Sequence, residues 1–452
     1  MSDINVEKLS KEEAKVRFDK IADDLIKPMT KFGTSFQIWA FVLFLSLTLF
    51  GYAYFIQVRD GLGVTGMHDY AAWGMYIANF VFFVAIALVG MLITAVLGLT
   101  GIKWITPVSR IAEMIAVAFA MIAGLVIVFD MGRPDRVLNV FIHGRVQSPI
   151  VWDLTVVMTY TAISTLLLIL PVIPDMAIVK KRLPNAPKWQ MMLWNILSLG
   201  WTGTPAQYKS IHKMVRVLAI LIVPVALAIH TVTSWLFAST LRHGWDSTIF
   251  GPYFVTGAFV SGVAAVIIAM YVLRKSYNLK DYLTDYHFDK IAKLLVLVSL
   301  VYFYFNINEF LVPAYKMKSG DDHHIMALFV GEWAGLFWFA QFFGNIIPIV
   351  LLLFKKFRKP GPMFIMAIGV ILGAWAKRYI IVIPTQLHPH LPIQNVPEAF
   401  HVYYPTGPEI AITLGAIGMA LTIVTILAKV FPVIPIWEVA EEAGIDRETI
   451  NE

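Results

Sequence analysis

The sequence predicts an all-α protein, a polytopic transmembrane helical bundle of about ten helices. Of its 452 residues, 58% are hydrophobic and 15% are charged, and the mean hydropathy is +0.71. This composition is too apolar for a soluble domain. The apolar residues also form ten runs, each long enough to cross a hydrocarbon core of roughly 30 Å as a helix of about 20 residues. Runs of this length exclude a β-barrel, whose strands need only about 10 residues of alternating polarity.

Each predicted span is an apolar run bounded by loop residues. Charged pairs close the first, sixth and eighth runs (Arg59-Asp60, Arg274-Lys275 and Lys355-Lys356), and proline or glycine bounds most of the others. The first run follows a charged arm and is long enough to span, so it predicts an insertion signal that is not cleaved. In chain order the runs cover residues 35–57, 71–99, 108–130, 149–173, 215–238, 251–273, 291–314, 327–354, 361–384 and 408–431.

The loop lysines and arginines predict the orientation. Most of them lie in the N-terminal arm and in the loops after the fourth, sixth and eighth spans, whereas residues 385–407 hold none. Because cytoplasmic loops carry the excess of Lys and Arg, both termini are expected in the cytoplasm. We therefore expect a multi-pass protein of the cytoplasmic membrane with a cytoplasmic arm at 1–34, a transmembrane domain at 35–432 and a cytoplasmic tail at 433–452.

Two parts of the predicted bundle resemble each other. Span two opens with Trp73-Gly74-Met75-Tyr76-Ile77 and span six with Phe250-Gly251-Pro252-Tyr253-Phe254, and the following span ends on an acid in both cases. The pattern predicts two pseudo-repeated four-helix bundles, at about 71–238 and 251–384, with the first and tenth spans as flanking helices. The alternative is that aromatic and glycine pairs recur by chance in apolar sequence.

Composition also excludes several cofactors. The chain has no cysteine, which rules out iron-sulfur ligation, c-type haem attachment and disulfides within it. Haem b needs two axial histidines at membrane depth, and only His230 lies deep inside a predicted span. We therefore expect no haem, iron-sulfur cluster or metal site in this chain. The net charge of +6 resides mainly in short loops, where it reports topology, so no nucleic-acid partner is expected.

The charged residues inside the predicted spans are unevenly placed. Such residues are costly in lipid and usually face a bundle interior or a cavity. Six of them fall in the outer halves of their spans, namely Asp130, Asp153, Glu309, Glu332, Lys377 and Arg378. Arg110 and Glu113 lie near the inner end of span three, at a spacing that allows a pair on one helix face. The alternative for any single charge is that it anchors a helix end or extends to the headgroups. The outward bias of the set favours a polar site near the outer surface.

Several short motifs follow one another along most of the chain. They are Trp73-Gly74-Met75-Tyr76-Ile77, Gly132-Arg133-Pro134, Ser148-Pro149 with Trp152-Asp153, Lys377-Arg378-Tyr379, Leu387-His388-Pro389 and Tyr403-Tyr404-Pro405. Their order and spacing resemble the NrfD/PsrC family of polysulfide reductase membrane subunits, most closely its DsrP/HmeB and ActC (alternative complex III) branches. Two positions depart from the pattern: Asp130 stands where ActC-like members carry His, and Lys377 stands where some members carry Glu.

The resemblance implies a menaquinone or menaquinol pocket near the outer face. It also implies an extracytoplasmic ferredoxin-like iron-sulfur subunit that exchanges electrons with that pocket, and further membrane, cytochrome c or catalytic subunits in the complex. Carried over by position, Asp153 matches the family's acid at the start of its span and is the candidate for the quinol proton. His143, in the connection from 130 to 153, is placed to hydrogen-bond a quinone carbonyl and is a residue type that commonly transfers protons.

These considerations give three groups of candidate residues. The acid-base group consists of Asp153, His143 and Asp130. The quinone-binding group consists of Tyr76, Asn79, Arg133 and Trp152. The proton-path group consists of Glu309, Glu332, Arg378, Lys377, Arg110 and Glu113.

The leading hypothesis is a quinone/quinol-interacting integral membrane subunit of a respiratory oxidoreductase complex, with proton translocation as an additional hypothesis. One alternative is a secondary transporter, because duplicated helical halves with buried charges are common in that class. Transporters usually place their ligand groups at the membrane midplane, whereas the polar residues here are biased outward. The other alternative is a purely structural anchor of the complex.

Overall fold

The computed structural model describes residues 10–389 and 394–451. All regular secondary structure within these residues is helical. The α-helices are α1 (Lys11–Thr30), α2 (Thr34–Asp60), α3 (Met75–Ala87), α4 (Thr106–Asp130), α5 (Asn139–Ile142), α6 (Pro149–Arg182), α7 (Lys188–Leu197), α8 (Pro205–Ala238), α9 (Phe250–Ser276), α10 (Asp285–Lys316), α11 (Asp321–Phe329), α12 (Ala334–Gln341), α13 (Ile347–Leu352), α14 (Pro360–Leu387), α15 (Gly407–Val430), α16 (Ile436–Glu442) and α17 (Arg447–Asn451). Two π-helical segments, Met91–Leu97 and Phe342–Ile346, continue α3 and join α12 to α13.

Ten helical segments of the described residues are long and apolar enough to cross a membrane, by length and composition. Each coincides with one of the predicted runs, so the predicted number and order of the spans are confirmed. Two of these spans begin later in the chain than predicted. Span two begins at Met75 rather than at residue 71, and span eight begins at Ala334 rather than at residue 327. The chain turns tightly at Gly331 between α11 and α12, where a Cβ atom would lie 2.8 Å from the Cα of Ala327.

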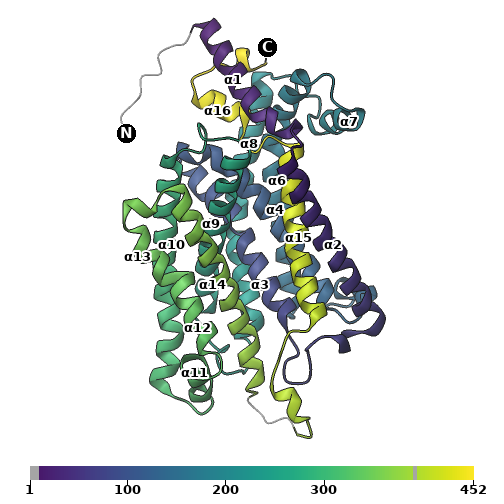
Figure 1. Cartoon of the computed structure of the whole chain (residues 1–452), viewed down its shortest axis with the longest axis vertical. Coiled ribbons are helices and arrows are strands. Elements are labelled where there is room, and N and C mark those ends of the chain that lie inside the picture. Colours follow the sequence, from purple (N-terminus) through teal and green to yellow (C-terminus); the bar gives the residue numbers. More distant parts are fainter. Residues whose placement is uncertain (1–9, 390–393, 452) are drawn as a thin grey trace.

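The long helices pack in two groups (Figure 1). Helices α3, α4, α6 and α8 form the first helical group, and α9, α10, α14 and the α12–α13 segment form the second. Contacts of α9 with α3 and α8, and of α14 with α3, join the two groups. Helices α2 and α15 pack against each other, and α15 also packs on α4. This arrangement agrees with the predicted pair of four-helix bundles flanked by the first and tenth spans, while their origin from a repeat stays a prediction.

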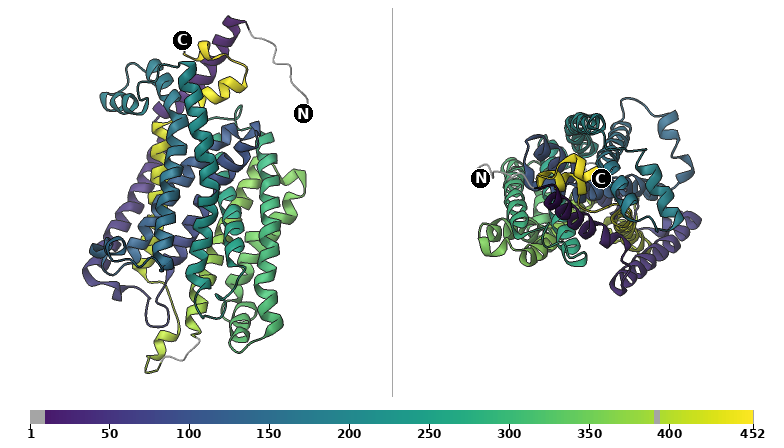
Figure 2. Two further views of the ribbon diagram at one scale, coloured as in Figure 1. Left: turned by 180° about the vertical axis from the view of Figure 1, so that it is seen from behind. Right: turned by 90° about the horizontal axis from the view of Figure 1, so that it is seen from above.

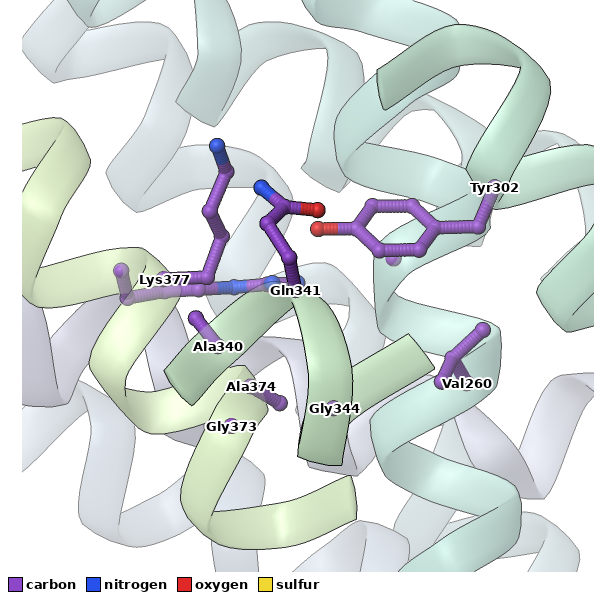
Figure 3. A pocket seen from close by; sticks show the side chains of 10 residues that line it. Val260, Tyr302, Ala340, Gln341, Gly344, Gly373, Ala374 and Lys377 are labelled. Carbon is purple, nitrogen blue, oxygen red and sulfur yellow. The ribbon is translucent and has the colours of Figure 1, made fainter. Parts of the chain in front are cut away.

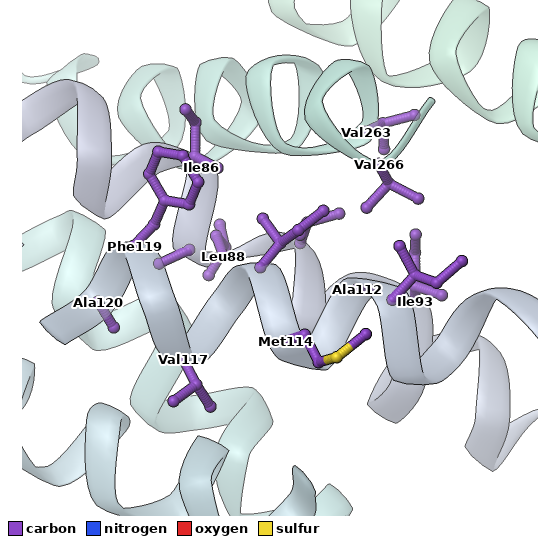
Figure 4. Close-up of a cluster of buried hydrophobic side chains, with 14 of the residues drawn as sticks. Ile86, Leu88, Ile93, Ala112, Met114, Val117, Phe119, Ala120, Val263 and Val266 are labelled. Atoms are coloured by element: carbon purple, nitrogen blue, oxygen red, sulfur yellow. The ribbon is translucent and has the colours of Figure 1, made fainter. Parts of the chain in front are cut away.

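Tightly packed apolar side chains fill the junction between the groups (Figure 4). Val89 and Gly262 meet there, and a Cβ atom on the glycine would lie 2.7 Å from the Cβ of Val89. Met114 and Ala112 of α4 are 0% exposed, as is Val266 of α9. Such close packing holds the two groups at a fixed distance, so polar residues on facing helices are positioned by the apolar core.

Helices α1, α16 and α17 gather at one end of the bundle (Figures 1 and 2). Helix α1 starts with a capping box between Ser10 and Glu13 and packs on α15, α16 and α17. The predicted arm and tail thus lie at the same end of the molecule. We call this end the inner end and the opposite end the outer end, following the predicted orientation.

Candidate functional site

Asp153 lies in the second turn of α6 and is 3% exposed. Ser148 precedes this helix and Pro149 occupies its first turn, which suits proline because the first turn needs no backbone donor there. The hydroxyl of Thr233, on α8, donates a hydrogen bond to Oδ1 of Asp153. A carboxylate has about four lone-pair sites, and one hydroxyl satisfies one of them. Asp153 can therefore be protonated at its other carboxylate oxygen while the hydrogen bond from Thr233 stays in place.

His230 lies one turn from Thr233 on the same face of α8 and is 3% exposed. Its Nε2 atom is enclosed and has no hydrogen-bond partner among the described residues. Buried polar atoms are normally paired, so an unpartnered ring nitrogen marks a place where a further donor or acceptor belongs. Sequence reasoning used His230 only to exclude haem, and it missed Thr233 because a threonine in an apolar span gives no distinct signal.

Asp130 and Tyr76 lie at the outer end of the first helical group, linked through Gln57 of α2. The Tyr76 hydroxyl donates to Oε1 of Gln57 (2.6 Å), and Nε2 of Gln57 donates to the carbonyl of Phe129 (2.6 Å). Asp130 is half-buried at the last position of α4, and its Oδ1 has no partner among the described residues. This polar chain joins α2, α3 and α4 and leaves one carboxylate oxygen of Asp130 available.

Asn79 of α3 is 1% exposed, and both ends of its amide are used. Its Nδ2 donates to the hydroxyl of Thr413 (2.7 Å), and its Oδ1 accepts from Nε1 of Trp375 (2.8 Å). The side chain therefore ties α3 to α14 and α15. A role in lining a quinone pocket stays a prediction, and the contacts themselves indicate a brace between helices.

The connection between α4 and α6 is more exposed than the sequence suggested. Arg133 is paired with its neighbour Asp135 (2.9 Å), and both side chains are more than half exposed. His143 is exposed in the loop after α5. Trp152 is 38% exposed, donates to the Val146 carbonyl, and its ring lies 6.5 Å from that of Trp235. The structure thus leaves Arg133, His143 and Trp152 outside the buried group that contains Asp153.

Glu409 is a buried acid that sequence reasoning did not select. It is 0% exposed at the start of α15 and accepts from the hydroxyl of Tyr403 (2.6 Å) and from the backbone N–H groups of Gly66 (2.8 Å) and Thr406 (2.9 Å). The Tyr403 hydroxyl in turn accepts from the N–H of Met75 (2.9 Å), the first residue of α3. The sequence feature that could have identified Glu409 is the order Thr406-Gly-Pro-Glu409, which is a capping box before an apolar run.

The second helical group contains a stripe of buried polar side chains on α10. Ser299, Tyr302, Asn306 and Glu309 recur at intervals of three or four residues, so they share one face, and each is at most 8% exposed. Asn306 accepts from the hydroxyl of Tyr253 (3.1 Å) and donates to Oε1 of Gln341. Glu309 accepts from the Ser247 hydroxyl (3.0 Å). Only Glu309 was predicted, because single neutral polar residues in a span resemble ordinary packing positions.

Lys377 and Arg378 lie on α14 beside this stripe and are 3% and 4% exposed. The Lys377 ammonium lies 4.2 Å from the centre of the Phe310 ring, an attractive cation–π contact. Both residues border a small cavity together with Gln341, Tyr302 and other residues of the second group (Figure 3). The predicted pair of cations is therefore inside the protein and not at the headgroups.

Glu332 was predicted about one turn inside span eight, and this placement is wrong. It precedes α12, is exposed, and accepts a hydrogen bond from Nε1 of its neighbour Trp333 (2.8 Å). The sharp turn at Gly331 separates α11 from α12, so Glu332 lies in a connection and not in a helix.

Arg110 forms its ion pair with Asp175 of α6 and not with Glu113, which was the predicted partner. Its two terminal nitrogens also donate to the carbonyls of Pro171 (3.1 Å) and Pro432 (3.2 Å). Asp175 is 0% exposed and accepts from the backbone N–H groups at the start of α16. The predicted run ended at residue 173, and an acid two residues further on was overlooked.

The tail helix α16 covers this inner pair. Nε1 of Trp437 donates to the carbonyl of Pro171 (2.9 Å), and burial raises the pKa of the neighbouring Glu438 to about 7, against the opposing effect of Arg110. Glu438 therefore contributes to the stability of the folded state in its protonated form, and this contribution is lost as the pH rises through its folded-state pKa. The ion pair of Arg110 with Asp175 and the contacts of α16 together hold the tail against α4 and α6, which is a structural role at the inner end.

The likeness to known proteins decides the family. The family model described as polysulphide reductase, NrfD, matches residues 63–390, which is more than half of the chain. The chain belongs to the NrfD family. The matched region contains both helical groups, including Asp153 and the α10 stripe.

Three similar proteins extend over most of the chain. A selenate reductase subunit of Mesobacillus selenatarsenatis is 24% identical, covering 84% of this chain and 90% of its own length. The Hdr-like menaquinol oxidoreductase integral membrane subunit of Archaeoglobus fulgidus is 24% identical over 91% of this chain and 98% of its own. The menaquinone reductase integral membrane subunit of Nitratidesulfovibrio vulgaris is 20% identical, with 92% and 94% covered. Two of these three names refer to menaquinone or menaquinol.

Proposed function

We propose that this NrfD-family chain is a quinone/quinol-interacting integral membrane subunit of a respiratory oxidoreductase complex. In this proposal it exchanges electrons between menaquinol and an extracytoplasmic iron-sulfur subunit. The names of the relatives support the quinone class and the presence of partner subunits. The observation that carries the proposal is Asp153, a buried acid near the outer end of α6 with a single hydroxyl donor.

The residues around the outer half of the first helical group fit a quinone head. Two enclosed polar atoms lack partners among the described residues, Oδ1 of Asp130 and Nε2 of His230. A carboxylate oxygen can accept from a quinol hydroxyl, and an imidazole N–H can donate to a quinone carbonyl. The residue before Asp130, Phe129, packs against two aromatic rings of α2, at 5.0 Å from that of Phe50 and 5.2 Å from that of Tyr54. Polar ends beside an apolar surface are what an amphiphilic ring requires.

When bound, the quinone supplies reversible two-electron, two-proton chemistry, which this chain lacks by itself. Asp153 holds or releases a proton at its free carboxylate oxygen, and Thr233 keeps the side chain oriented. Asp130 is the second proton acceptor, at the end of α4 where water can reach it because the residue is half-buried. His143, exposed in the outer loop, accepts protons that leave the site. The hydrogen bonds of Tyr76 and Asn79 hold α3 against α2, α14 and α15.

Electrons leave or enter through another subunit in this proposal, because the chain has no cysteine for a cluster. The outer loop between α4 and α6 is the proposed contact surface. It presents Arg133, Arg136 and Arg145 together with exposed apolar side chains such as Phe141 and Val146. A mixture of arginine and apolar side chains is typical of protein interfaces.

Purification of the native complex tests this proposal. We expect a ferredoxin-like iron-sulfur protein to copurify with the chain, and organic extraction of the complex to yield about one quinone per chain. A purified complex without iron-sulfur protein, together with no saturable binding of a quinone analogue, would refute the proposal. The secondary-transporter alternative is not favoured by the family membership. A purely structural anchor would retain electron transfer after the outer acids are neutralised.

We also propose that the α10 stripe transfers protons within the outer half of the second helical group. Glu309 and Lys377 form the titratable part, Arg378 is a permanent charge next to Lys377, and Tyr302, Asn306 and Gln341 are the hydrogen-bonded part. The face of α10 below Ser299 carries Leu295, Ile291 and Phe288, which are at most 1% exposed. Arg110 is held by Asp175, and Glu113 lies on the same inner turn, so we propose no route through the inner half.

Glu309→Gln should remove this transfer. In proteoliposomes containing the complete complex, we expect proton movement beyond the quinone protons to fall at least about 10-fold, because proton transfer by a positioned group contributes about 10²–10⁴-fold. Quinone-linked electron transfer should remain, since Glu309 lies in the other helical group. The measurement is internal pH during turnover, with Glu398→Gln, at an exposed outer residue, as the control. Unchanged proton movement in Glu309→Gln would rule out this role.

A further inference from the structure

Arg378 is a buried cation without an ionic partner among the residues that the structure describes. Its residue is 4% exposed, and no carboxylate of the described residues lies within 4.0 Å of its guanidinium. Arginine cannot lose its proton in a protein, so it stays charged wherever it is placed. Transfer of an uncompensated charge into a medium of low dielectric constant is very unfavourable. The charge of Arg378 therefore requires compensation from somewhere.

The other buried arginine shows how this chain compensates such a charge internally. Arg110 is 1% exposed, pairs with the buried carboxylate of Asp175, and donates to two backbone carbonyls. Arg378 has no equivalent set of acceptors among the described residues. Within the described residues of the second helical group, Glu309 is the one buried carboxylate, and its hydrogen bond is with Ser247. Lys377, next to Arg378, adds a second cation to the same region.

Arg378 instead borders a cavity of about 10 Å³. This is about the volume that one water molecule needs. The cavity lies among α9, α10, α12 and α14, and the ends of Lys377, Gln341 and Tyr302 come together there (Figure 3). The backbones of Gly344 and Gly373 touch below it, since a Cβ on Gly373 would lie 2.4 Å from the Cα of Gly344.

The polar groups around the cavity are mostly donors. Oε1 of Gln341 accepts from Asn306, which leaves the amide NH₂ of Gln341 for the cavity. Lys377 and Arg378 carry donors only. The absence of a side chain on Gly257 makes room for the guanidinium, because a Cβ there would lie 2.9 Å from Nη2 of Arg378 and 2.9 Å from the ring of Tyr302. A buried site lined by two cations and an amide NH₂ is complementary to an anion.

We infer that this cavity binds a small monovalent inorganic anion of the chloride class, which neutralises Arg378 inside the second helical group. The anion is a resident counterion and not a substrate of the electron-transfer reaction. It joins α12 and α14 through Gln341 and Arg378, as Asp175 joins α4 and α6 through Arg110. Because the anion binds the folded state and not the unfolded chain, it stabilises the folded state by RT ln(1 + c/Kd), where c is the anion concentration.

The test is thermal unfolding of the purified full chain in detergent, in sodium gluconate at constant ionic strength, with chloride or bromide replacing gluconate. We expect Tm to rise by about 2 °C or more with either halide, and to follow the logarithm of the halide concentration once that concentration exceeds the Kd. Arg378→Gln should lose the response. Lys359→Gln, which removes an exposed cation at the start of the same helix, should keep it. Two results would overturn the inference. One is a halide-dependent rise in Tm of the same size in Arg378→Gln, and the other is a wild-type Tm that is no higher in halide than in gluconate.

A second variant keeps the test valid where Arg378→Gln fails to fold. Gly257→Ala retains the arginine but places a methyl group 2.9 Å from its guanidinium, so the apparent halide affinity should fall at least about 10-fold. Line broadening of chloride-35 NMR signals measures the affinity directly, without unfolding. Equal broadening by wild type and Gly257→Ala would contradict a site at this cavity.

Discussion

Asp153→Asn is expected to reduce quinone-linked electron transfer by the assembled complex at least about 100-fold. The amide keeps the size of the side chain and can still accept from the Thr233 hydroxyl, but it cannot hold or release a proton. Loss of a positioned acid or base lowers rates by about 10²–10⁴-fold. The measurement is the steady-state rate with a soluble menaquinol analogue, together with the protein composition of the purified complex, which should be unchanged.

Asp69→Asn is the matched control for this prediction. It makes the same chemical change at the outer end, but at an exposed carboxylate between α2 and α3 that lies outside the proposed contact surface. We expect a rate within about two-fold of the wild type. Thr233→Val should have an intermediate effect, because Asp153 stays titratable and loses only the group that orients it. A wild-type rate in Asp153→Asn would show that this acid has no part in the proton chemistry.

Asp175→Ala is expected to destabilise the protein by about 3–5 kcal/mol. The substitution leaves Arg110, which is 1% exposed, without its carboxylate, and breaking a buried pair in this way is far more costly than replacing both members. It also removes the acceptor for the N–H groups of Ile436 and Trp437. The measurement is the Tm of the purified protein, with limited proteolysis of the tail as a second readout.

Arg110→Met combined with Asp175→Leu separates ion pairing from general damage. Replacing both members with apolar residues removes the unpaired charge, so the double variant should recover most of the lost stability. An Asp175→Ala protein as stable as the wild type would show that the pair does not hold α4, α6 and the tail together. A double variant no more stable than the single one would assign the loss to the α16 contacts.

The sequence predicted the spans because the membrane imposes a simple rule on them. Every crossing needs about 20 apolar helical residues, so number and order can be read from hydropathy alone. The predicted start of span eight, at residue 327, was wrong because the chain turns at Gly331. Helix α11 ends at Phe329 and α12 begins at Ala334, with the close backbone approach at Gly331 between them.

The candidate site was predicted less completely. Selection of charged residues found Asp153, Glu309, Lys377 and Arg378, all of them buried. It also placed Glu332 inside span eight, although this residue is exposed, because charge alone does not distinguish a loop from a helix end. Arg133 and His143 were expected in the outer connection, and both are exposed there. The same selection missed Glu409 and Asp175, which lie at the edges of apolar runs where acids are common. It also missed Gln341 and Asn306, because neutral side chains carry no charge signal.

The sequence by itself determined the all-α class, the ten spans, the absence of cysteine-based cofactors and the resemblance to a quinone-linked family. These properties depend on composition and on patterns within single helices. The tertiary structure alone decided which polar groups meet. Arg110 finds its carboxylate 65 residues away and Asp153 its hydroxyl 80 residues away, whereas Arg378 borders a cavity and meets no carboxylate within 4.0 Å among the described residues. Such partners come from different helices, and the packing of apolar faces, not local sequence, sets which helices lie together.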